Sequence, residues 1–314
     1  MNRRNFLRAS ATFASAGLLS RSGLFSQIPQ ASAAANAPAL ADGFVALRRN
    51  VGIFKGRGGT IGWLASPDAL AVVDTQFPDT AQKCLAGIPL RGERMIDIVI
   101  NTHHHGDHTS GNTVFGPVAK KIVAHKNVPG LQRAAAARGK PPTLDRQVYA
   151  GTTFADSWKM DLGDETVHAR HFGPAHTGGD IIVHFEKANV VHMGDLIFNR
   201  IYPVIDRVGG ASIANWIKIL ETTAATYPSD AIYIFGHAND APQFGPVGKR
   251  TDLPVMRDYL AGLLEHTQRQ IAAGKSREEI AALDALPGFP DYRTPQNRLR
   301  ANLGVAYDEL TTKA

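Results

Sequence analysis

Short apolar runs bounded by turn residues recur along the chain and predict two series of β-strands. The run at 97–101 is almost continuously apolar, which is typical of a strand covered on both faces. The first series consists of residues 44–47, 62–65, 71–74 and 97–101. The second series begins near residue 153 and includes 166–172, 181–185, 189–193 and 231–235. Because residues 181–185 and 189–193 are separated by a short turn, they predict a hairpin.

Segments with helical periodicity lie between and after these runs. They are residues 79–86, 131–138, 213–225, 253–273 and 276–285. Two rounds of strands, each accompanied by helices, predict an α/β fold in which two sheets pack together with helices outside. No repeat with the period of a solenoid or propeller is evident. No linker divides residues 36–314, so we expect a single domain with a helical C-terminal region.

The charge balance argues against a nucleic-acid partner. The chain has 314 residues, of which 44% are hydrophobic and 20% charged, an ordinary globular composition. Its formal net charge of +6 would favour a polyanion. However, four arginines and no acidic residue lie in the first 33 positions, and without these charges the formal net charge is +2. The expected folded part therefore offers no strong positive potential to attract nucleic acid.

The N-terminal segment resembles a twin-arginine export signal. Arg3 and Arg4 open it, a mildly apolar stretch follows at 9–19, and small residues at 31–35 could be cut by a signal peptidase. We therefore expect residues 1–35 to form a signal peptide and the twin-arginine translocation machinery to be a partner during export. The destination would be the periplasm. No apolar run approaches the roughly 20 residues of a membrane span, so no anchor should remain after signal removal.

A dense group of metal-ligand residue types follows the strand at 97–101. It reads His103-His104-His105-Gly106-Asp107-His108. In an extended segment His103 and His105 point to the same side, so both imidazoles can reach one ion. Asp107 and His108 follow where a turn could direct them at a second ion. Imidazole and carboxylate groups suit zinc and its neighbours. An exposed His-rich tract is the alternative interpretation, but it does not account for the ligand-type residues found downstream.

Three further residues of ligand type lie at the ends of predicted strands. They are His176, Asp195 and His237, and each has a glycine nearby in sequence. Loops at strand ends are where catalytic groups usually lie. Glycine allows the close backbone approach that a crowded metal site needs.

In this order, and with Asp74 at the end of an early strand, these motifs resemble those of the metallo-β-lactamase-fold hydrolase superfamily. The resemblance covers roughly residues 44–237. It implies a four-layer αβ/βα sandwich with two Zn²⁺ ions at one edge; Fe or Mn is the alternative. It also implies a role for each candidate: a first ion held by His103, His105 and His176, a second held by Asp107, His108 and His237, Asp195 bridging both, and Asp74 orienting a ligand loop.

An aspartate at position 195 resembles the pattern of glyoxalase II, lactonases and phosphodiesterases, whereas some true β-lactamases carry a cysteine there. The expected function is thus a dinuclear zinc-dependent hydrolase of a small ester, thioester, lactone or lactam. The resemblance implies attack by a hydroxide shared between the metals, with Asp107 as the catalytic residue that orients it. A metallo-β-lactamase, a phosphodiesterase and a non-hydrolytic metal-binding or redox protein of the same fold stay open as alternatives. The substrate, the native metal and the oligomeric state also stay open.

Overall fold

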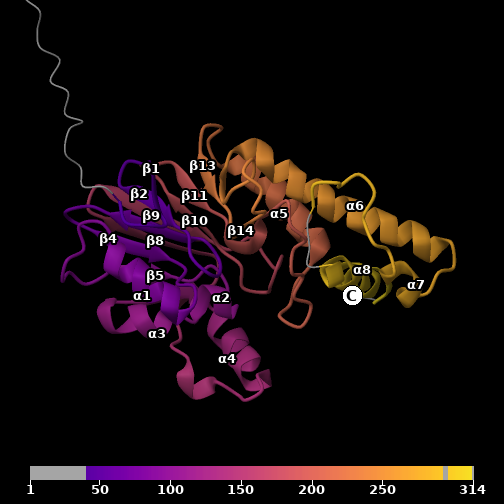
Figure 1. The fold of residues 1–314 in the computed structure, drawn as a ribbon, viewed down its shortest axis with the longest axis horizontal. Helices are drawn as coiled ribbons and strands as arrows, with labels where there is room; N and C mark the ends of the chain where they lie inside the picture. The colour runs from indigo at the N-terminus through magenta and orange to yellow at the C-terminus, as the bar shows by residue number, and fades with distance from the viewer. Residues whose placement is uncertain (1–39, 293–295, 313–314) are drawn as a thin grey trace, which may run out of the picture. The chain divides into compact units, whose positions relative to one another are not determined.

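The computed structural model describes residues 40–292 and 296–312 (Figure 1). The export signal expected at residues 1–35 lies outside the described residues, so the signal, the periplasmic destination and the translocation partner stay predictions. No helix in the described ranges combines the length and the apolar character needed to cross a bilayer.

The first sheet has seven strands in chain order, which makes it the simpler of the two large sheets. Its strands are β1 (Phe44–Arg48), β2 (Val51–Phe54), β3 (Ile61–Ala65), β4 (Leu70–Val73), β5 (Ile98–Ile100), β6 (Ile122–His125) and β7 (Thr152–Phe154). Neighbours from β1 to β4 are antiparallel, and those from β4 to β7 are parallel. The parallel strands need crossover connections. These contain helices α1 (Pro78–Gly87), α2 (Gly106–Thr109), α3 (Asn112–Phe115) and α4 (Val128–Arg138).

The second sheet has six strands in the order β15-β13-β11-β10-β9-β8. Its strands are β8 (Ser157–Leu162), β9 (Glu165–Arg170), β10 (Ile182–Phe185), β11 (Val190–His192), β13 (Ile232–Ile234) and β15 (Val247–Gly248). Strands β10 and β11 form the predicted hairpin, with Val183 opposite His192. A small separate sheet pairs β12 (Phe198–Asn199) with β14 (His237–Ala238). Helices α5 (Ile213–Thr226), α6 (Leu253–Ala272), α7 (Arg277–Ala281) and α8 (Gln296–Thr311) complete the described part.

Three apolar cores show how these elements form layers. One core lies between the sheets and joins buried residues of both, such as Ile98 and Val183. A second joins the first sheet to helices on its outer side, and a third joins the second sheet to α5, α6 and α8. In Figure 1 the helices α1, α3 and α4 lie on one side of the strands and α5 lies on another. The predicted four-layer αβ/βα sandwich is therefore confirmed.

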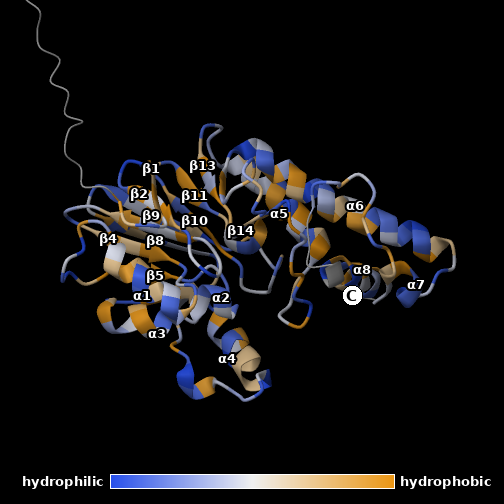
Figure 2. Cartoon of the chain, in the orientation of Figure 1, coloured by the Kyte–Doolittle hydropathy of each residue, from blue (hydrophilic) through white to orange (hydrophobic). Residues whose placement is uncertain are grey.

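One strand lies in a different sheet from the one expected. We expected the run near residue 153 to begin the second sheet, but β7 is parallel to β6 and ends the first sheet. An apolar run does not specify its neighbour, and here the crossover through α4 returns the chain to the sheet that it left. Helices α5 and α6 agree with the prediction; each mixes hydrophobic and hydrophilic residues along its length, as surface helices do (Figure 2).

The C-terminal helix α8 caps the start of α5. The Glu309 carboxylate accepts hydrogen bonds of 2.9 Å from the backbone N–H groups of Ile213 and Ala214. These donors have no partner inside α5, because the first N–H groups of a helix never do. A negative charge at this end also matches the helix dipole. Glu309 thus ties α8 to the layer that covers the second sheet.

Replacing Glu309 with glutamine should lower the free energy of unfolding by about 1 kcal/mol, because the charge and one strong acceptor are lost. Urea unfolding followed by circular dichroism would measure this. Glu265→Gln is the matched control, since Glu265 is exposed and, within the described residues, pairs with Arg269 on the same helix face; it should change stability by less than about 0.5 kcal/mol. Equal midpoints for the two variants would contradict the capping role.

Candidate metal centre

Ends of parallel strands bring the sequence-predicted site residues to one edge of the sandwich. Asp74 follows β4, the segment 102–108 follows β5, and Asp195 follows β11. His237 lies shortly after β13, at the start of β14. Strands β4 and β5 are parallel neighbours, and so are β11 and β13. Carboxyl ends of parallel strands lie at the same edge of a sheet, which is where loop residues can meet. His176 comes from the turn between β9 and β10.

The first group consists of His103, His105, His176 and Asp195, whose candidate ligand atoms all lie within 4.8 Å of one another. His105 Nδ1 lies 3.2 Å from His103 Nε2 and 3.0 Å from His176 Nε2. Asp195 Oδ2 lies 3.8 Å from His103 Nε2 and 3.4 Å from His176 Nε2. Three imidazole nitrogens and one carboxylate oxygen thus face a common point.

The second group consists of Asp107, His108 and His237. His237 Nε2 lies 3.1 Å from Asp107 Oδ2 and 3.4 Å from His108 Nε2. The distance from His108 Nε2 to Asp107 Oδ2 is 3.8 Å. His108 is fully buried, whereas the side chains of Asp107 and His237 are partly exposed. The second group is therefore the more open of the two toward solvent.

Asp195 faces both groups. Its Oδ1 lies 3.0 Å from His108 Nε2, and its Oδ2 lies 3.4 Å from both His176 Nε2 and His237 Nε2. The side chain is 3% exposed, and no N–H group of the described residues, His108 Nε2 included, is aligned for a hydrogen bond to Oδ1. A buried carboxylate oxygen without a hydrogen bond is costly unless something else compensates its charge.

The donor set fits metal ions. Ligands of a tetrahedral ion with bonds of about 2.0–2.1 Å lie about 3.3 Å apart, close to the spacings in both groups. In the first group, His176 Nδ1 and His105 Nε2 each have an oxygen acceptor, so His176 Nε2 and His105 Nδ1 direct lone pairs at each other across 3.0 Å. A cation between these two nitrogens would remove the repulsion. Histidine and aspartate are the ligand types that zinc accepts. The side chains that the sequence singled out are thus brought together as two groups that could each hold an ion.

Burial keeps two imidazoles of the first group, those of His103 and His176, neutral. Desolvation lowers the pKa of His176 to about 3 and holds the pKa of His103 well below its usual value. A neutral imidazole is the form that binds a metal. These two side chains therefore have a free nitrogen lone pair at physiological pH.

In the second group, neighbouring groups of opposite charge shift the pKa values more than burial does. Burial would raise the pKa of Asp107, but the neighbouring His108 and His237 lower it to about 2. Burial would likewise lower the pKa of His237, but Asp195 and Asp107 raise it to about 9. A divalent cation bound here would displace a proton from the His237 imidazole.

Asp74 fixes two of the imidazoles from outside the groups. Its Oδ2 accepts a hydrogen bond of 2.7 Å from His108 Nδ1 and one of 2.8 Å from the Thr102 hydroxyl. Its Oδ1 accepts one of 2.8 Å from the Thr102 backbone N–H. The Thr102 oxygen in turn accepts from His103 Nδ1 at 3.0 Å. Both rings therefore present Nε2 to the cluster, an arrangement that also raises ligand basicity.

Asp206 has a similar position but was not identified from the sequence. Its Oδ2 lies 3.0 Å from His105 Nε2 and 3.3 Å from His104 Nε2, so His105 presents Nδ1 to the first group. Burial opposes ionisation of Asp206, but hydrogen bonds from both histidines hold its pKa below the usual range. No strand end or glycine motif marks this residue, because it lies in the irregular loop after β12.

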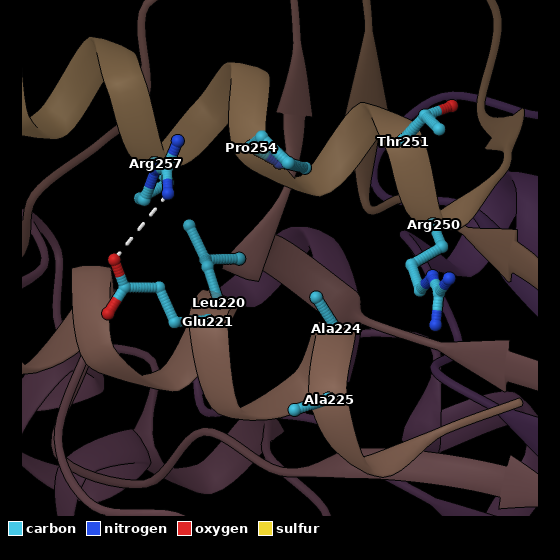
Figure 3. A pocket seen from close by; sticks show the side chains of 8 residues that line it. All are labelled: Leu220, Glu221, Ala224, Ala225, Arg250, Thr251, Pro254 and Arg257. Atoms are coloured by element: carbon cyan, nitrogen blue, oxygen red, sulfur yellow. Dashed lines mark ion pairs between the residues drawn. The ribbon is translucent and has the colours of Figure 1, made fainter. Parts of the chain in front are cut away.

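A cavity of about 500 Å³ between α5 and α6 is separate from this centre (Figure 3). In the view, Leu220 and Ala224 of α5 point toward α6, which carries Pro254, and Arg257 pairs with Glu221 at 3.6 Å. None of the candidate ligands lines this cavity. Apolar side chains form much of its wall, beside the charged Glu221, Arg250 and Arg257.

Comparison with known proteins gives the family. Residues 55–237 match the family model described as "Metallo-beta-lactamase superfamily". The hydroxyacylglutathione hydrolases of Brucella ovis and Brucella abortus (strain 2308) are each 27% identical over 244 residues, covering 76% of this chain and 84% of the relative. These findings confirm the expected enzyme class, a metal-dependent hydrolase.

Solved structures show the same fold at low identity. A sec-alkylsulfatase from Pseudomonas sp. is 17% identical with a TM-score of 0.64, covering 86% of this chain and 50% of that one. This chain thus spans about half the length of the alkylsulfatase. A metallo-beta-lactamase from Pontibacter korlensis is 15% identical with a TM-score of 0.56, covering 69% of this chain and 98% of that one. Since the family model covers more than half of the sequence, the chain belongs to the metallo-beta-lactamase superfamily.

Proposed function

We propose that the protein binds two metal ions, zinc by preference, and hydrolyses a small ester, thioester, lactone or lactam. The observation that carries this proposal is the position of Asp195, whose two oxygens face the two groups of candidate ligands. In the proposed assignment, His103, His105 and His176 hold one ion, Asp107, His108 and His237 hold the other, and Asp195 is shared. Bound zinc would supply Lewis acidity that polarises the substrate and activates water near neutral pH.

The residues of the chain have separate tasks in this proposal. Asp107, part-exposed and with a pKa lowered to about 2, is ionised at neutral pH and can accept a hydrogen bond that orients the attacking water. Asp74 and Asp206 hold the ligand rings in place. Phe198 stacks on His237 with centroids 5.2 Å apart and an interplanar angle of 17°, which limits the movement of that ring.

The relatives favour a thioester among the candidate substrates, because the Brucella proteins are named hydroxyacylglutathione hydrolases. The other classes are tested by the same substrate panel. Nitrocefin reports on a β-lactamase, and bis(p-nitrophenyl) phosphate reports on a phosphodiesterase. Elemental analysis that distinguishes iron from zinc tests a redox or metal-storage role.

Removing the metal should abolish the activity. We expect the purified protein to carry two zinc ions per chain and to hydrolyse a simple thioester, S-acetyl-N-acetylcysteamine. Incubation with EDTA followed by desalting should remove the turnover, and two equivalents of zinc should restore it. Hydrolysis that continues in metal-free protein, or fewer than two ions in fully active protein, would contradict the proposal.

A further inference from the structure

His192 of β11 is fully buried and belongs to neither group of candidate ligands. Its ring lies against β3 of the other large sheet, where a Cβ at Gly62 would come within 2.8 Å of it. Its Nδ1 accepts a hydrogen bond of 3.1 Å from the Gly194 N–H, and its Nε2 lies 3.0 Å from the carbonyl oxygen of Thr60. Since an N–H can only donate and a carbonyl can only accept, Nε2 carries the proton and the ring is neutral.

Hydrogen bonds close a circuit that joins His192 to two turns. The Thr60 N–H and hydroxyl both donate to the carbonyl oxygen of Gly236, at 2.9 and 3.1 Å. The Gly236 N–H donates in turn to the carbonyl oxygen of Gly194 at 2.8 Å, and the Gly194 N–H donates to His192. The imidazole therefore links the end of its own strand to the loop that precedes β3.

Each of the two turns carries a proposed metal ligand. Gly194 directly precedes Asp195, and Gly236 directly precedes His237. A shift of the backbone at either glycine therefore moves the carboxylate or the imidazole that follows it.

The loop before β3 also contacts the two remaining ligands of the second group. The Gly59 N–H donates to the carbonyl oxygen of Asp107 at 3.0 Å. A Cβ at Gly59 would overlap the ring of His108, so the backbone of the loop lies directly on that imidazole. Residues 59–60, which we call the bracket, and His192 together contact segments that carry every proposed ligand of the second ion.

The first group is held in place by other contacts. Its imidazoles turn their outer nitrogens to the Thr102 hydroxyl, the Asp206 carboxylate and the carbonyl oxygen of Val204. Within residues 40–292 and 296–312, no hydrogen bond joins these three imidazoles to the bracket or to His192. A change at His192 should therefore affect the second ion more than the first.

We propose that His192 is a positioning residue for the second metal ion, and that it acts through the bracket and the Gly194 turn. It touches neither the ion nor the substrate; it fixes the distance between the backbone segments that carry the ligands. Contacts of this kind around a metal site are typically worth 10- to 100-fold in metal affinity. The inference rests on the proposed function, because it requires that two ions bind.

The main test measures zinc affinity by competition with a chromophoric chelator. His192→Leu leaves the Gly194 N–H and the Thr60 carbonyl without their buried partner. It should weaken binding of the second ion by about 10- to 100-fold and of the first by less than about 3-fold. Because a glutamine amide can still donate to the Thr60 carbonyl, His192→Gln should recover part of this loss. At limiting zinc, kcat on S-acetyl-N-acetylcysteamine should fall with occupancy of the second position, with little change in KM.

A second pair of variants tests the bracket without emptying a buried site. Valine has the shape of threonine but no hydroxyl, so Thr60→Val removes the hydrogen bond of 3.1 Å to Gly236. It should weaken binding of the second ion by about 3- to 10-fold. Thr60→Ser keeps the hydroxyl and should bind both ions as the unmodified protein does. If His192→Leu does not fold, His192→Gln and this pair decide.

His184→Leu is the matched control. His184 lies opposite Val191 on the neighbouring strand β10, and its ring packs against Tyr227 with centroids 5.0 Å apart. In the described part of the chain it forms no hydrogen bond with the bracket or the Gly194 turn, so both zinc affinities should stay unchanged.

Unchanged affinity for the second ion in His192→Leu and Thr60→Val would overturn the inference. Equal weakening of both ions, or an equal effect of His184→Leu, would overturn it as well. Fewer than two ions in the unmodified protein, or no turnover of any thioester, would instead contradict the proposed function.

Discussion

Replacing Asp195 with alanine should reduce the metal content from two ions to at most one and lower kcat/KM by at least about 10³-fold. The reason is that Asp195 is the one proposed ligand whose oxygens face both groups, so its loss affects both positions. The catalytic advantage of paired metal ions depends on both being held in place. Metal analysis after desalting and steady-state kinetics on S-acetyl-N-acetylcysteamine would measure the two effects.

Asp195→Asn and Asp206→Asn complete this experiment. The asparagine at 195 keeps the volume of the side chain, which separates the loss of charge from the creation of a cavity. Asp206 contacts His105 from outside the first group, so its replacement should cost only about 10- to 100-fold, the usual effect of an orienting contact. Two ions bound to Asp195→Ala with unchanged affinity would rule out the shared position of Asp195.

Replacing Gly236 with alanine should disturb the centre almost as strongly, although glycine has no side chain to bind a metal. A Cβ at this position would overlap Asp195 Oδ1 and would lie 2.8 Å from the carbonyl carbon and oxygen of Gly194. Backbone atoms cannot move aside as a flexible side chain can, so the strand end and the carboxylate must shift. We expect a loss of at least about 100-fold in kcat/KM, since small displacements of catalytic groups have such effects, and a destabilisation of about 1–3 kcal/mol.

Gly151→Ala provides the matched control. A Cβ at Gly151 meets no atom within 4 Å, so this substitution should change stability by less than about 0.5 kcal/mol. Thermal unfolding with and without EDTA would separate damage to the fold from loss of the metal. If Gly236→Ala bound two zinc ions and matched Gly151→Ala in activity, the close packing of residue 236 against Asp195 would have no functional consequence.

The sequence predicted the elements whose pattern is local. Residues 181–185 and 189–193 form the expected hairpin, and α5 spans Ile213–Thr226 where the periodicity placed a helix at 213–225. The place of β7 in the first sheet was missed, because its pattern does not reveal its neighbour β6. The C-terminal helix α8 was also missed, and only its packing on α6 and its contact with the start of α5 explain its position.

The sequence by itself determined which side chains carry the chemistry. Histidine, aspartate and neighbouring glycines at strand ends are identities and spacings that can be read along the chain, and their order matched one superfamily. Only the tertiary structure decided how they are held and what lies beside them. Asp206 on His105 and Gly236 against Asp195 join segments far apart in the sequence. Such contacts depend on the packing of irregular loops, and periodicity carries no information about which loops meet.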